Sequence, residues 1–425
     1  MKNHHIYLIL RPLLLVLALA LTVTAQEIPK AKPEDVGMSS PRLQTLSATL
    51  DGYVKNERLA GGVALVLRRG KVAYLHAFGE RDRESKSAMK PDAIFRIASQ
   101  SKALTSVAIM MLQEEGKLTI GDPVSKFIPE FANSTVAVPK DGGGYDIVKA
   151  KRQITLRDLL THTSGASYGG GPARDKWQEA KVNSFYFSDK DEPVCETIRR
   201  MASLPMDAHP GERYIYGYST DILGCVVERA SGMTFNAFLQ QKIFDPLGMK
   251  DTSFYLPMNK LDRLATVYSA KDGKIERAPN EGTIQSQGHY VNGPRKSFSG
   301  GAGLLSTASD YARFLQMLLN GGQLDGKRIL SRKSVELMTT DHMRSINFGR
   351  EGQGFGLGFS VVKDVGAYGA PSSIGEYGWG GAYHSTYWVD PKEQLVVVYM
   401  TQLLPTGGVD DYAKLRAGIY GAIVD

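Results

Sequence analysis

Strand-like segments lie towards both ends of this chain, and mainly helix-like segments lie between them. Near the N-terminus, residues 63–67 and 72–75 are rich in β-branched and apolar side chains and flank residues 68–71, which read as a hairpin turn. The C-terminal candidates share that composition and are residues 355–362, 380–389 and 395–401. Segments so far apart most simply share one antiparallel sheet if the intervening region folds as an insertion. The sequence therefore predicts an α+β protein, an antiparallel sheet flanked by helices with an inserted, mainly helical lobe.

Helical periodicity marks the segments around and between these strands. In residues 39–58, four apolar side chains fall on one helical face: Leu43, Leu46, Leu50 and Val54. Further helices are expected at residues 154–161, 193–202, 221–231, 234–244, 305–320 and 411–423. We expect a single catalytic domain over residues 26–425, with the sheet lobe at about 26–98 and 300–425 and the helical lobe at about 99–299.

A serine and a lysine stand three residues apart at the start of one predicted helix. Apolar residues recur at helical spacing from Leu104, and Gly116 lies where that helix should end. Ser99 and Lys102 therefore share a face of the first turn. A serine hydroxyl becomes nucleophilic when a nearby base takes its proton, and lysine can be that base if burial and the helix dipole disfavour its charged form. The alternative is an N-cap serine followed by a solvated lysine.

A serine–lysine enzyme also needs a proton relay and an oxyanion hole. Tyr216 and Tyr218 lie where a turn opens a helix, so either side chain could serve as the relay or could instead be packed. Residues 377–382 begin a predicted strand and contain three glycines. Glycine lets a substrate approach the backbone closely, and a free amide at a strand edge can bind an oxyanion. The alternative is an ordinary glycine bend at a sheet edge.

A second serine competes for the role of nucleophile. Residues 165–169 match G-x-S-x-G around Ser167, the nucleophile elbow of α/β-hydrolases. That elbow requires a strand before the serine and a helix after it. Here a predicted helix precedes Ser167 and a Gly/Pro loop follows it, so we interpret the motif as a chance match.

The N-terminus resembles an export signal. Lys2 and Arg11 supply positive charge, residues 12–25 are apolar, and small residues precede Gln26. The apolar run is shorter than the roughly 18–20 residues needed to span a bilayer. We therefore expect cleavage of residues 1–25 as a signal peptide, leaving a monomeric periplasmic or secreted protein without a membrane span.

Composition argues against several classes of partner. The formal charge of +7 falls to about +5 without Lys2 and Arg11, and the basic residues are scattered, which disfavours nucleic-acid binding. The eight histidines show no metal-ligand spacing, and the chain contains no C-x-x-C. We expect no metal and no other cofactor.

The only two cysteines are Cys195 and Cys225. An exported chain could pair them, but a protein of this size does not need a disulfide for stability, and sequence cannot establish pairing. Cys225 lies within the apolar run at residues 222–227, where a small buried side chain is the commoner explanation. The sequence therefore favours unpaired cysteines.

Taken together, the motifs indicate a family. Ser99-x-x-Lys102, the segment around Tyr216 and Trp379-Gly380-Gly381 follow the order and the approximate separations of the serine β-lactamase/penicillin-recognising superfamily. The chain most resembles the family VIII carboxylesterases, which are similar to class C β-lactamases. Supporting stretches are residues 159–165, 246–249 and 304–311, and the similarity extends over about residues 35–420.

This resemblance implies an active site between the two lobes and a role for each motif. Ser99 would be the nucleophile, Lys102 its base, and Tyr216, which matches the tyrosine of Y-x-N, the partner of Lys102 in proton transfer. Trp379-Gly380-Gly381 would take the place of K-T-G, and the oxyanion hole would be the amides of Ser99 and Ala382.

Two positions depart from the family pattern. Tyr218 replaces the asparagine of Y-x-N, and Trp379 replaces the lysine of K-T-G. Both positions face substrate in β-lactamases, so the changes disfavour β-lactam turnover as the main activity while leaving acyl transfer intact.

The sequence thus predicts a carboxylesterase for short-chain esters that acts through an acyl-enzyme, with secondary cephalosporin hydrolysis. One alternative is a β-lactamase or D-amino-acid peptidase. A second is a catalytically silent, peptidoglycan-binding relative, although the serine, lysine and tyrosine are all retained.

Overall fold

The computed structural model describes residues 27–182, 186–282 and 284–425, so the expected signal peptide lies outside the described residues. The helices are α1 Ser40–Lys55, α2 Ser101–Glu114, α3 Leu156–Leu160, α4 Arg174–Glu179, α5 Val194–Met201, α6 Ser219–Ser231, α7 Phe235–Leu239, α8 Asp245–Leu247, α9 Ala308–Leu319, α10 Arg332–Met338, α11 Val365–Tyr368 and α12 Asp411–Gly421. The strands are β1 Gly61–Arg68, β2 Lys71–Asp82, β3 Ser87–Ala88, β4 Phe95–Arg96, β5 Thr135–Pro139, β6 Tyr145–Lys149, β7 Tyr268–Lys271, β8 Lys274–Arg277, β9 Leu305–Ser306, β10 Gln323–Leu324, β11 Lys327–Arg328, β12 Gln353–Phe355, β13 Ser360–Val362, β14 Tyr377–Gly381, β15 Ser385–Asp390 and β16 Leu395–Met400.

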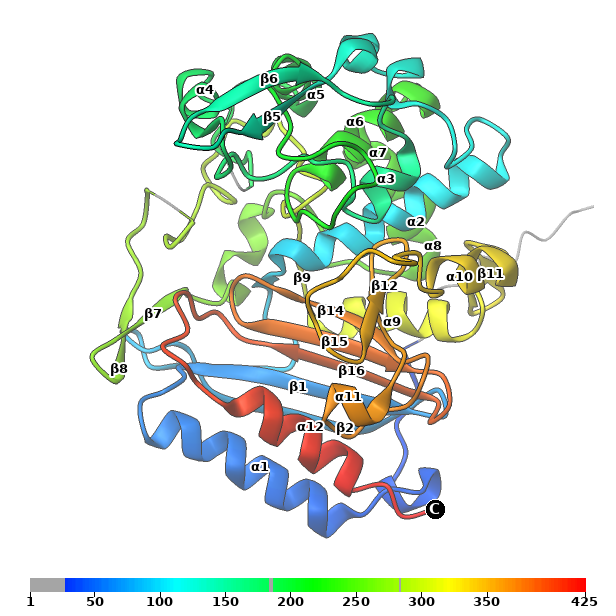
Figure 1. Ribbon diagram of the computed structural model, residues 1–425. Coiled ribbons are helices and arrows are strands. Elements are labelled where there is room, and N and C mark those ends of the chain that lie inside the picture. The colour runs from blue at the N-terminus through cyan, green and yellow to red at the C-terminus, as the bar shows by residue number, and fades with distance from the viewer. Residues whose placement is uncertain (1–26, 183–185, 283) are drawn as a thin grey trace, which may run out of the picture.

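One antiparallel sheet is built from the two ends of the chain. Its strand order is β12-β13-β14-β15-β16-β1-β2-β3 (Figure 1). The pairing of β1 with β16 runs from Val63 opposite Met400 to Arg68 opposite Leu395 and joins the N-terminal strands to the C-terminal ones. This pairing confirms the predicted sheet and the insertion of the helical region between its two halves.

Both faces of the sheet are covered by helices. Side chains alternate along a strand, so Val63 and Leu65 of β1 point into the core that contains α2 and α9. Ala64 and Val66 point the opposite way, into the core formed with α1 and α12. Figure 1 shows α1 and α12 side by side on that second face. Because both faces are covered, β1 is buried along its whole length.

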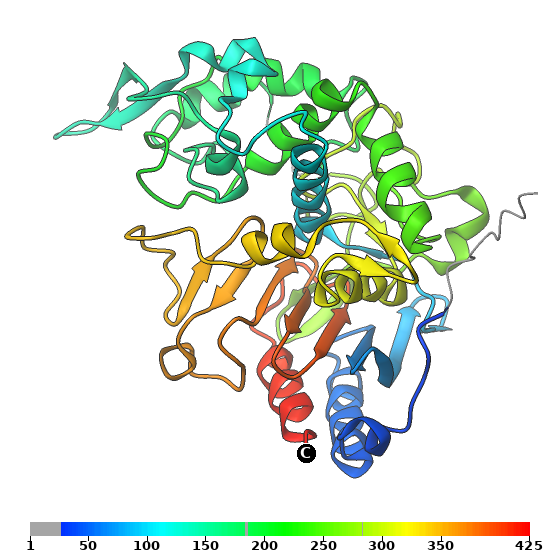
Figure 2. The ribbon, with the colours of Figure 1, turned by 90° about the vertical axis from the view of Figure 1, so that its right-hand side faces the viewer.

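The helical lobe lies on the side of the sheet opposite α1 and α12, as both ribbon views show (Figures 1 and 2). Helix α2 is buried along most of its length and packs against α6. The helices predicted for this lobe are confirmed, whereas the β5–β6 and β7–β8 hairpins were not predicted from the sequence. In the described part of the chain, no helix combines the length and apolar character needed to cross a bilayer.

Two predicted C-terminal strands are in fact hairpins. Residues 355–362 contain the end of β12, a turn and β13, with Gly358 at a φ of 99° in the turn. Residues 380–389 contain the end of β14, a turn at residues 382–384 and most of β15. The single-strand prediction was wrong because composition alone does not reveal a turn between short strands of similar character.

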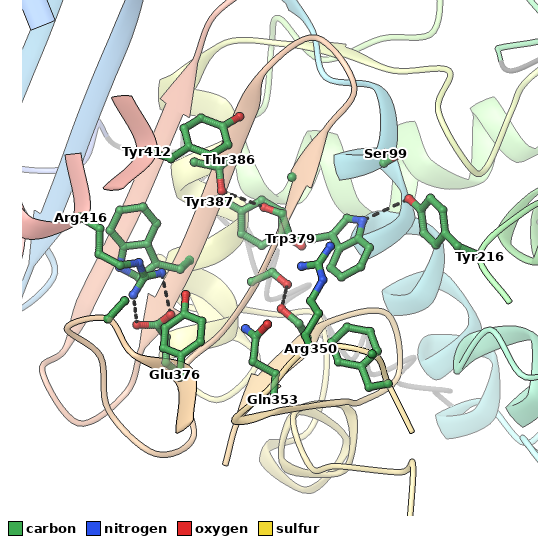
Figure 3. A pocket seen from close by; sticks show the side chains of 18 of the residues that line it. Ser99, Tyr216, Arg350, Gln353, Glu376, Trp379, Thr386, Tyr387, Tyr412 and Arg416 are labelled. Atoms are coloured by element: carbon green, nitrogen blue, oxygen red, sulfur yellow. Dashed lines mark hydrogen bonds and ion pairs between the residues drawn. The ribbon is translucent and has the colours of Figure 1, made fainter. Parts of the chain in front are cut away.

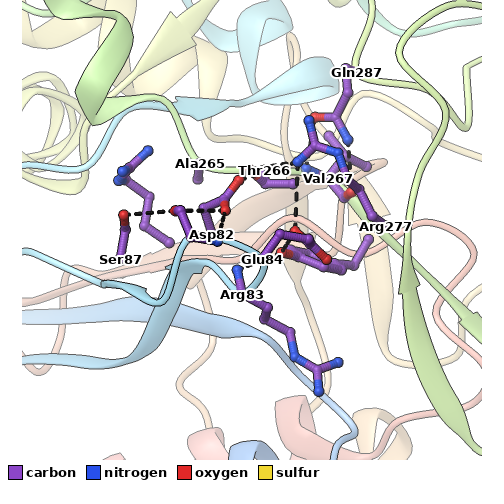
Figure 4. Close-up of polar contacts among 12 residues, drawn as sticks. Asp82, Arg83, Glu84, Ser87, Ala265, Thr266, Val267, Arg277 and Gln287 are labelled. Atoms are coloured by element: carbon purple, nitrogen blue, oxygen red, sulfur yellow. Dashed lines mark hydrogen bonds and ion pairs between the residues drawn. The ribbon is translucent and has the colours of Figure 1, made fainter.

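Polar contacts join the β7–β8 hairpin to the sheet. The Asp82 carboxylate accepts hydrogen bonds from Thr266 at 2.7 Å and Arg277 at 3.2 Å (Figure 4). Although burial opposes ionisation, hydrogen bonds from Thr266 and Ser85 lower the pKa of Asp82 to about 2. The Tyr268 hydroxyl donates a hydrogen bond to the Glu84 carboxylate at 2.7 Å and adds a second contact between the hairpin and the end of β2. Part of the insertion is therefore held directly against the sheet.

The two cysteines form a disulfide, which corrects the expectation of free thiols. Cys195 on α5 and Cys225 on α6 are bonded, with their Cα atoms 5.1 Å apart. Both residues are buried where the two helices pack together. The sequence correctly indicated burial, but the packing of α5 on α6, which brings the sulfurs together, is a tertiary feature.

Candidate active site

A cavity of about 850 Å³ is lined by residues of β14 and by Ser99, which precedes α2. Its walls combine aromatic side chains with a few polar groups (Figure 3). Five residues predicted from the sequence line it together: Ser99, Tyr216, Trp379, Gly380 and Ala382. Lys102, which contacts Ser99, and Gly381, which lies between Gly380 and Ala382 in the chain, do not line the cavity themselves.

Ser99 stands on the tight turn that links β4 to α2. A single 3-10 turn at Ala98–Gln100 leads into α2, which begins at Ser101. Ala98 has a φ of 43°, a left-handed conformation that is unfavourable for a residue with a side chain. Such strain is found mostly where the surrounding structure enforces a functional geometry. Here it accompanies the presentation of Ser99 to the cavity rather than to the core.

Lys102 lies behind Ser99 and is only 2% exposed. Its Nζ is 2.8 Å from the carbonyl oxygen of Gly301, 3.3 Å from the hydroxyl oxygen of Tyr168 and 3.4 Å from Ser99 Oγ. The bond to Gly301 fixes the amine, and the longer contact places it where it can receive the serine proton. Catalytic hydrogen bonds are often long before substrate binds.

A buried carboxylate and a buried imidazole border Lys102. Asp221 accepts hydrogen bonds from Ser299 Oγ at 2.6 Å and from the Gly301 N–H at 3.0 Å, so Gly301 bridges Asp221 and Lys102. Burial raises the pKa of Asp221, while Lys102 and the two hydrogen bonds oppose that increase. Burial holds the pKa of His162 well below its usual range, and Lys102 lowers it further whenever the amine is protonated, so this imidazole stays neutral.

Tyr216 is held by Trp379. The indole N–H of Trp379 donates to the Tyr216 hydroxyl oxygen at 3.1 Å (Figure 3). Because that oxygen accepts from Trp379, its own proton points elsewhere and is free to be donated. Lys102 Nζ lies 4.6 Å from the centroid of the Tyr216 ring, so the amine contacts the ring face. The hydroxyl that Lys102 contacts is that of Tyr168.

The edge of β14 forms the wall facing Ser99. β13 pairs with β14 only at Tyr377 and Gly378, so the following residues have no strand on that side. A Cβ on Gly381 would lie 2.5 Å from the Ile97 carbonyl oxygen, so glycine allows the strand to approach the Ser99 turn. The Ala382 N–H has no hydrogen-bond partner in the described parts of the chain, as an oxyanion donor requires.

Tyr218 does not lie where the resemblance places it. It is 1% exposed and is not part of the cavity wall. Its ring packs 4.8 Å from Tyr168 and 6.1 Å from Trp177, measured between centroids. A large aromatic ring at this position is buried in the helical lobe instead of facing substrate, which corrects the prediction of a substrate contact.

Ser167 has a structural environment. It follows α3 and a short loop, not a strand, and its Oγ accepts from the Gly169 N–H at 3.0 Å. The adjacent Tyr168, which the sequence analysis did not single out, is the residue of this motif that reaches Lys102. Its position next to a glycine-rich loop was the only sequence signal for it.

Arg350 is a second cavity residue that was not predicted from the sequence. It lines the cavity from the loop before β12, with its guanidinium carbon 4.8 Å from the centroid of the Trp379 ring. Nothing in the local sequence distinguishes it from other surface arginines, because only the folded loop brings it to Trp379.

The sheet, the inserted helical lobe and the Ser99–Lys102 pair at the cavity define a β-lactamase-fold serine hydrolase. Residues 46–421 match the Beta-lactamase family, and the chain belongs to that family.

Individual relatives cover most of the chain. Protein Rv1367c of Mycobacterium tuberculosis is 36% identical over 379 residues, which cover 84% of this chain and 89% of that protein. Esterase EstB of Burkholderia gladioli is 31% identical over 375 residues, with the same two shares. Among solved structures, EstCE1, a hydrolase with promiscuous acyltransferase activity, superposes with a TM-score of 0.76 at 26% identity, covering 90% of this chain and 98% of that one.

Proposed function

We propose that this protein is a carboxylesterase of the family VIII type that hydrolyses short-chain esters through an acyl-enzyme on Ser99. The observation that carries the proposal is the position of Trp379, an uncharged indole that bonds Tyr216 and forms the cavity wall near Ser99. An apolar wall suits the alkyl or aryl group of an ester. Similarity to Esterase EstB supports the same substrate class.

The reaction begins with attack by Ser99 Oγ on the ester carbonyl, while Lys102 takes the serine proton. The N–H groups of Ser99 and Ala382 stabilise the oxyanion that forms. Tyr216 donates a proton to the departing alcohol, with the Trp379 bond holding its hydroxyl in position. The proton that Lys102 took from Ser99 then returns to Tyr216, which requires the amine to move from the Tyr168 hydroxyl that it contacts in this structure. Water then attacks the acyl-enzyme, and the acid is released as Ser99 recovers its proton.

We expect the native enzyme to have a higher kcat/KM for a short-chain aryl ester than for a chromogenic cephalosporin. K-T-G enzymes place a lysine where the β-lactam carboxylate binds, and losing such a charge-assisted bond costs about 1.5–3 kcal/mol, roughly ten- to a hundredfold. Trp379→Lys should therefore move the ratio of the two activities towards the cephalosporin. Parallel initial-rate measurements on both substrates give this ratio.

Trp379→Phe is the matched control, because phenylalanine removes the bond to Tyr216 without adding charge. It should lower turnover of both substrates and leave their ratio closer to native. A native enzyme that prefers the cephalosporin would contradict the proposal and favour the β-lactamase alternative.

We also propose that the chain is exported and that the mature protein begins at Gln26. The Cys195–Cys225 disulfide supports export, since disulfides persist in oxidising compartments. Protein recovered from the periplasm or the medium should show an intact mass lacking residues 1–25 and should not react with a thiol-alkylating reagent.

Closing a loop of 30 residues should stabilise the protein by about 3–4 kcal/mol, measured by denaturant unfolding with and without reductant.

The double variant Cys195→Ala/Cys225→Ala is the control for this effect. It should be less stable than the native protein and insensitive to reductant.

For the export prediction, a mature mass that retains residues 1–25 would point to an uncleaved anchor and not to a cleaved signal peptide.

A further inference from the structure

Arg350 brings a positive charge into the cavity that the motifs do not account for. Its guanidinium lies over the Trp379 ring, 4.8 Å from the centroid, and also over Phe348, at 5.5 Å. Figure 3 shows Arg350 reaching towards Trp379 from the loop below the indole. The charge thus lies close to the site without touching the groups assigned to catalysis.

The other charged groups of the cavity wall neutralise one another. Glu376 and Arg416 form a two-pronged ion pair at 2.8 Å in the part of the wall near α12. Arg350, by contrast, has no carboxylate within ion-pairing distance in the described residues. Arg350 is therefore the only uncompensated charge among the described residues that line the cavity.

The stacked geometry favours recognition of an anion. A guanidinium that lies over an aromatic face keeps the N–H groups of its planar edge available for a second partner. Those N–H groups match the two oxygens of a carboxylate, which they bind in bidentate fashion. Contacts with the neighbouring rings of Phe348 and Trp379 orient the guanidinium, which itself stays exposed to solvent.

We propose that Arg350 binds a carboxylate carried by the substrate, so that the preferred substrates are esters with an anionic end. The inference rests on the proposed esterase function and adds a substrate class to it. The Trp379 indole contacts Tyr216 through its N–H edge and Arg350 through its face. A carboxylate on Arg350 is thus separated from the reacting carbonyl by the indole, and a flexible chain can span that separation. The rigid bicycle of a cephalosporin instead holds its carboxylate next to the lactam ring.

The test compares esters that differ in one charge. On the acyl side, the para-nitrophenyl monoester of adipic acid is paired with para-nitrophenyl hexanoate. On the alcohol side, para-acetoxybenzoate is paired with para-acetoxybenzamide. For each pair, the kcat/KM of the anionic ester is divided by that of the neutral one. Arg350→Gln should lower this ratio about tenfold in at least one pair, and the affected pair identifies the half of the substrate that Arg350 binds.

Two control variants make the result specific to Arg350. Arg344→Gln removes one positive charge from the same loop but not from the cavity wall, so its ratio should stay native. Arg350→Lys keeps the charge without the planar fork and should give an intermediate ratio. Added salt should shrink the native preference, because it screens an exposed charge.

Unchanged ratios in both pairs for Arg350→Gln, or an equal fall for Arg344→Gln, would overturn the inference. Failure of the esterase proposal is distinct, since the native enzyme would then not hydrolyse even the neutral esters in a Ser99-dependent way.

Discussion

Ser99→Ala will reduce ester hydrolysis by on the order of 10³-fold or more. The loss follows from geometry. Ser99 lines the cavity on a turn with a strained residue before it, and the Lys102 amine lies 3.4 Å from its hydroxyl. Without that oxygen no acyl-enzyme can form, and only substrate binding and the oxyanion donors remain. Steady-state kinetics on a short-chain aryl ester, with folding checked by circular dichroism, measure the effect.

Ser167→Ala is the matched control for the competing motif. Ser167 is buried after α3 and bonds the Gly169 N–H, so its loss should affect local stability more than turnover. A covalent serine-directed phosphonate should label the native protein and the Ser167 variant but not the Ser99 variant. If the labelling pattern were reversed, the nucleophile would be Ser167 and the assignment of the site would be wrong.

Lys102→Ala and Tyr216→Phe should each lower kcat by roughly 10²- to 10⁴-fold, the usual range for losing a general acid or base. Lys102→Arg should not restore activity. A guanidinium stays protonated, and the buried site beside the Gly301 carbonyl is fitted to a compact amine. Rates measured over a range of pH separate loss of the base from a shift in its titration.

Tyr218→Phe is the control for Tyr216→Phe. Both variants remove one tyrosine hydroxyl from the same segment, but Tyr218 lies in the core and not on the cavity wall. Turnover should respond strongly at Tyr216 and weakly at Tyr218.

A near-normal Lys102→Arg enzyme would refute the role of a neutral lysine.

The fold was predictable where patterns are local and repeated. Most of the longer helices followed from periodicity, the β1–β2 hairpin followed from its β-rich composition, and the positions of strands at both chain ends indicated their pairing. The short helices α4, α10 and α11 were not predicted. The strand expected at residues 380–389 left out the first residues of β14, which begins at Tyr377. The sequence Tyr-Gly-Trp-Gly-Gly has a composition unlike that of most strands. Its conformation depends on its neighbours β13 and β15, which sequence composition does not specify.

Site residues that are brought together by local structure were also predictable from the sequence. Ser99 and Lys102 come together through a helical turn, so their spacing was sufficient to predict their contact. Tyr216 and Tyr218 are two residues apart in a turn, and only packing decides which one faces the cavity. Tyr168 and Arg350 reach the site on loops, so their roles depend on the complete fold.

The β1–β16 pairing also bears on when this enzyme becomes active. Ser99 and Lys102 are synthesised early, whereas the strand edge that faces them comes from residues close to the other end of the chain. Pairings between such distant segments form slowly, because a large part of the chain must be ordered before they are closed. Under the proposed mechanism, a nascent chain that carries Ser99 and Lys102 without the Ala382 amide cannot stabilise an oxyanion fully. We therefore expect hydrolytic activity to report completion of the sheet and not the earlier folding of the helices.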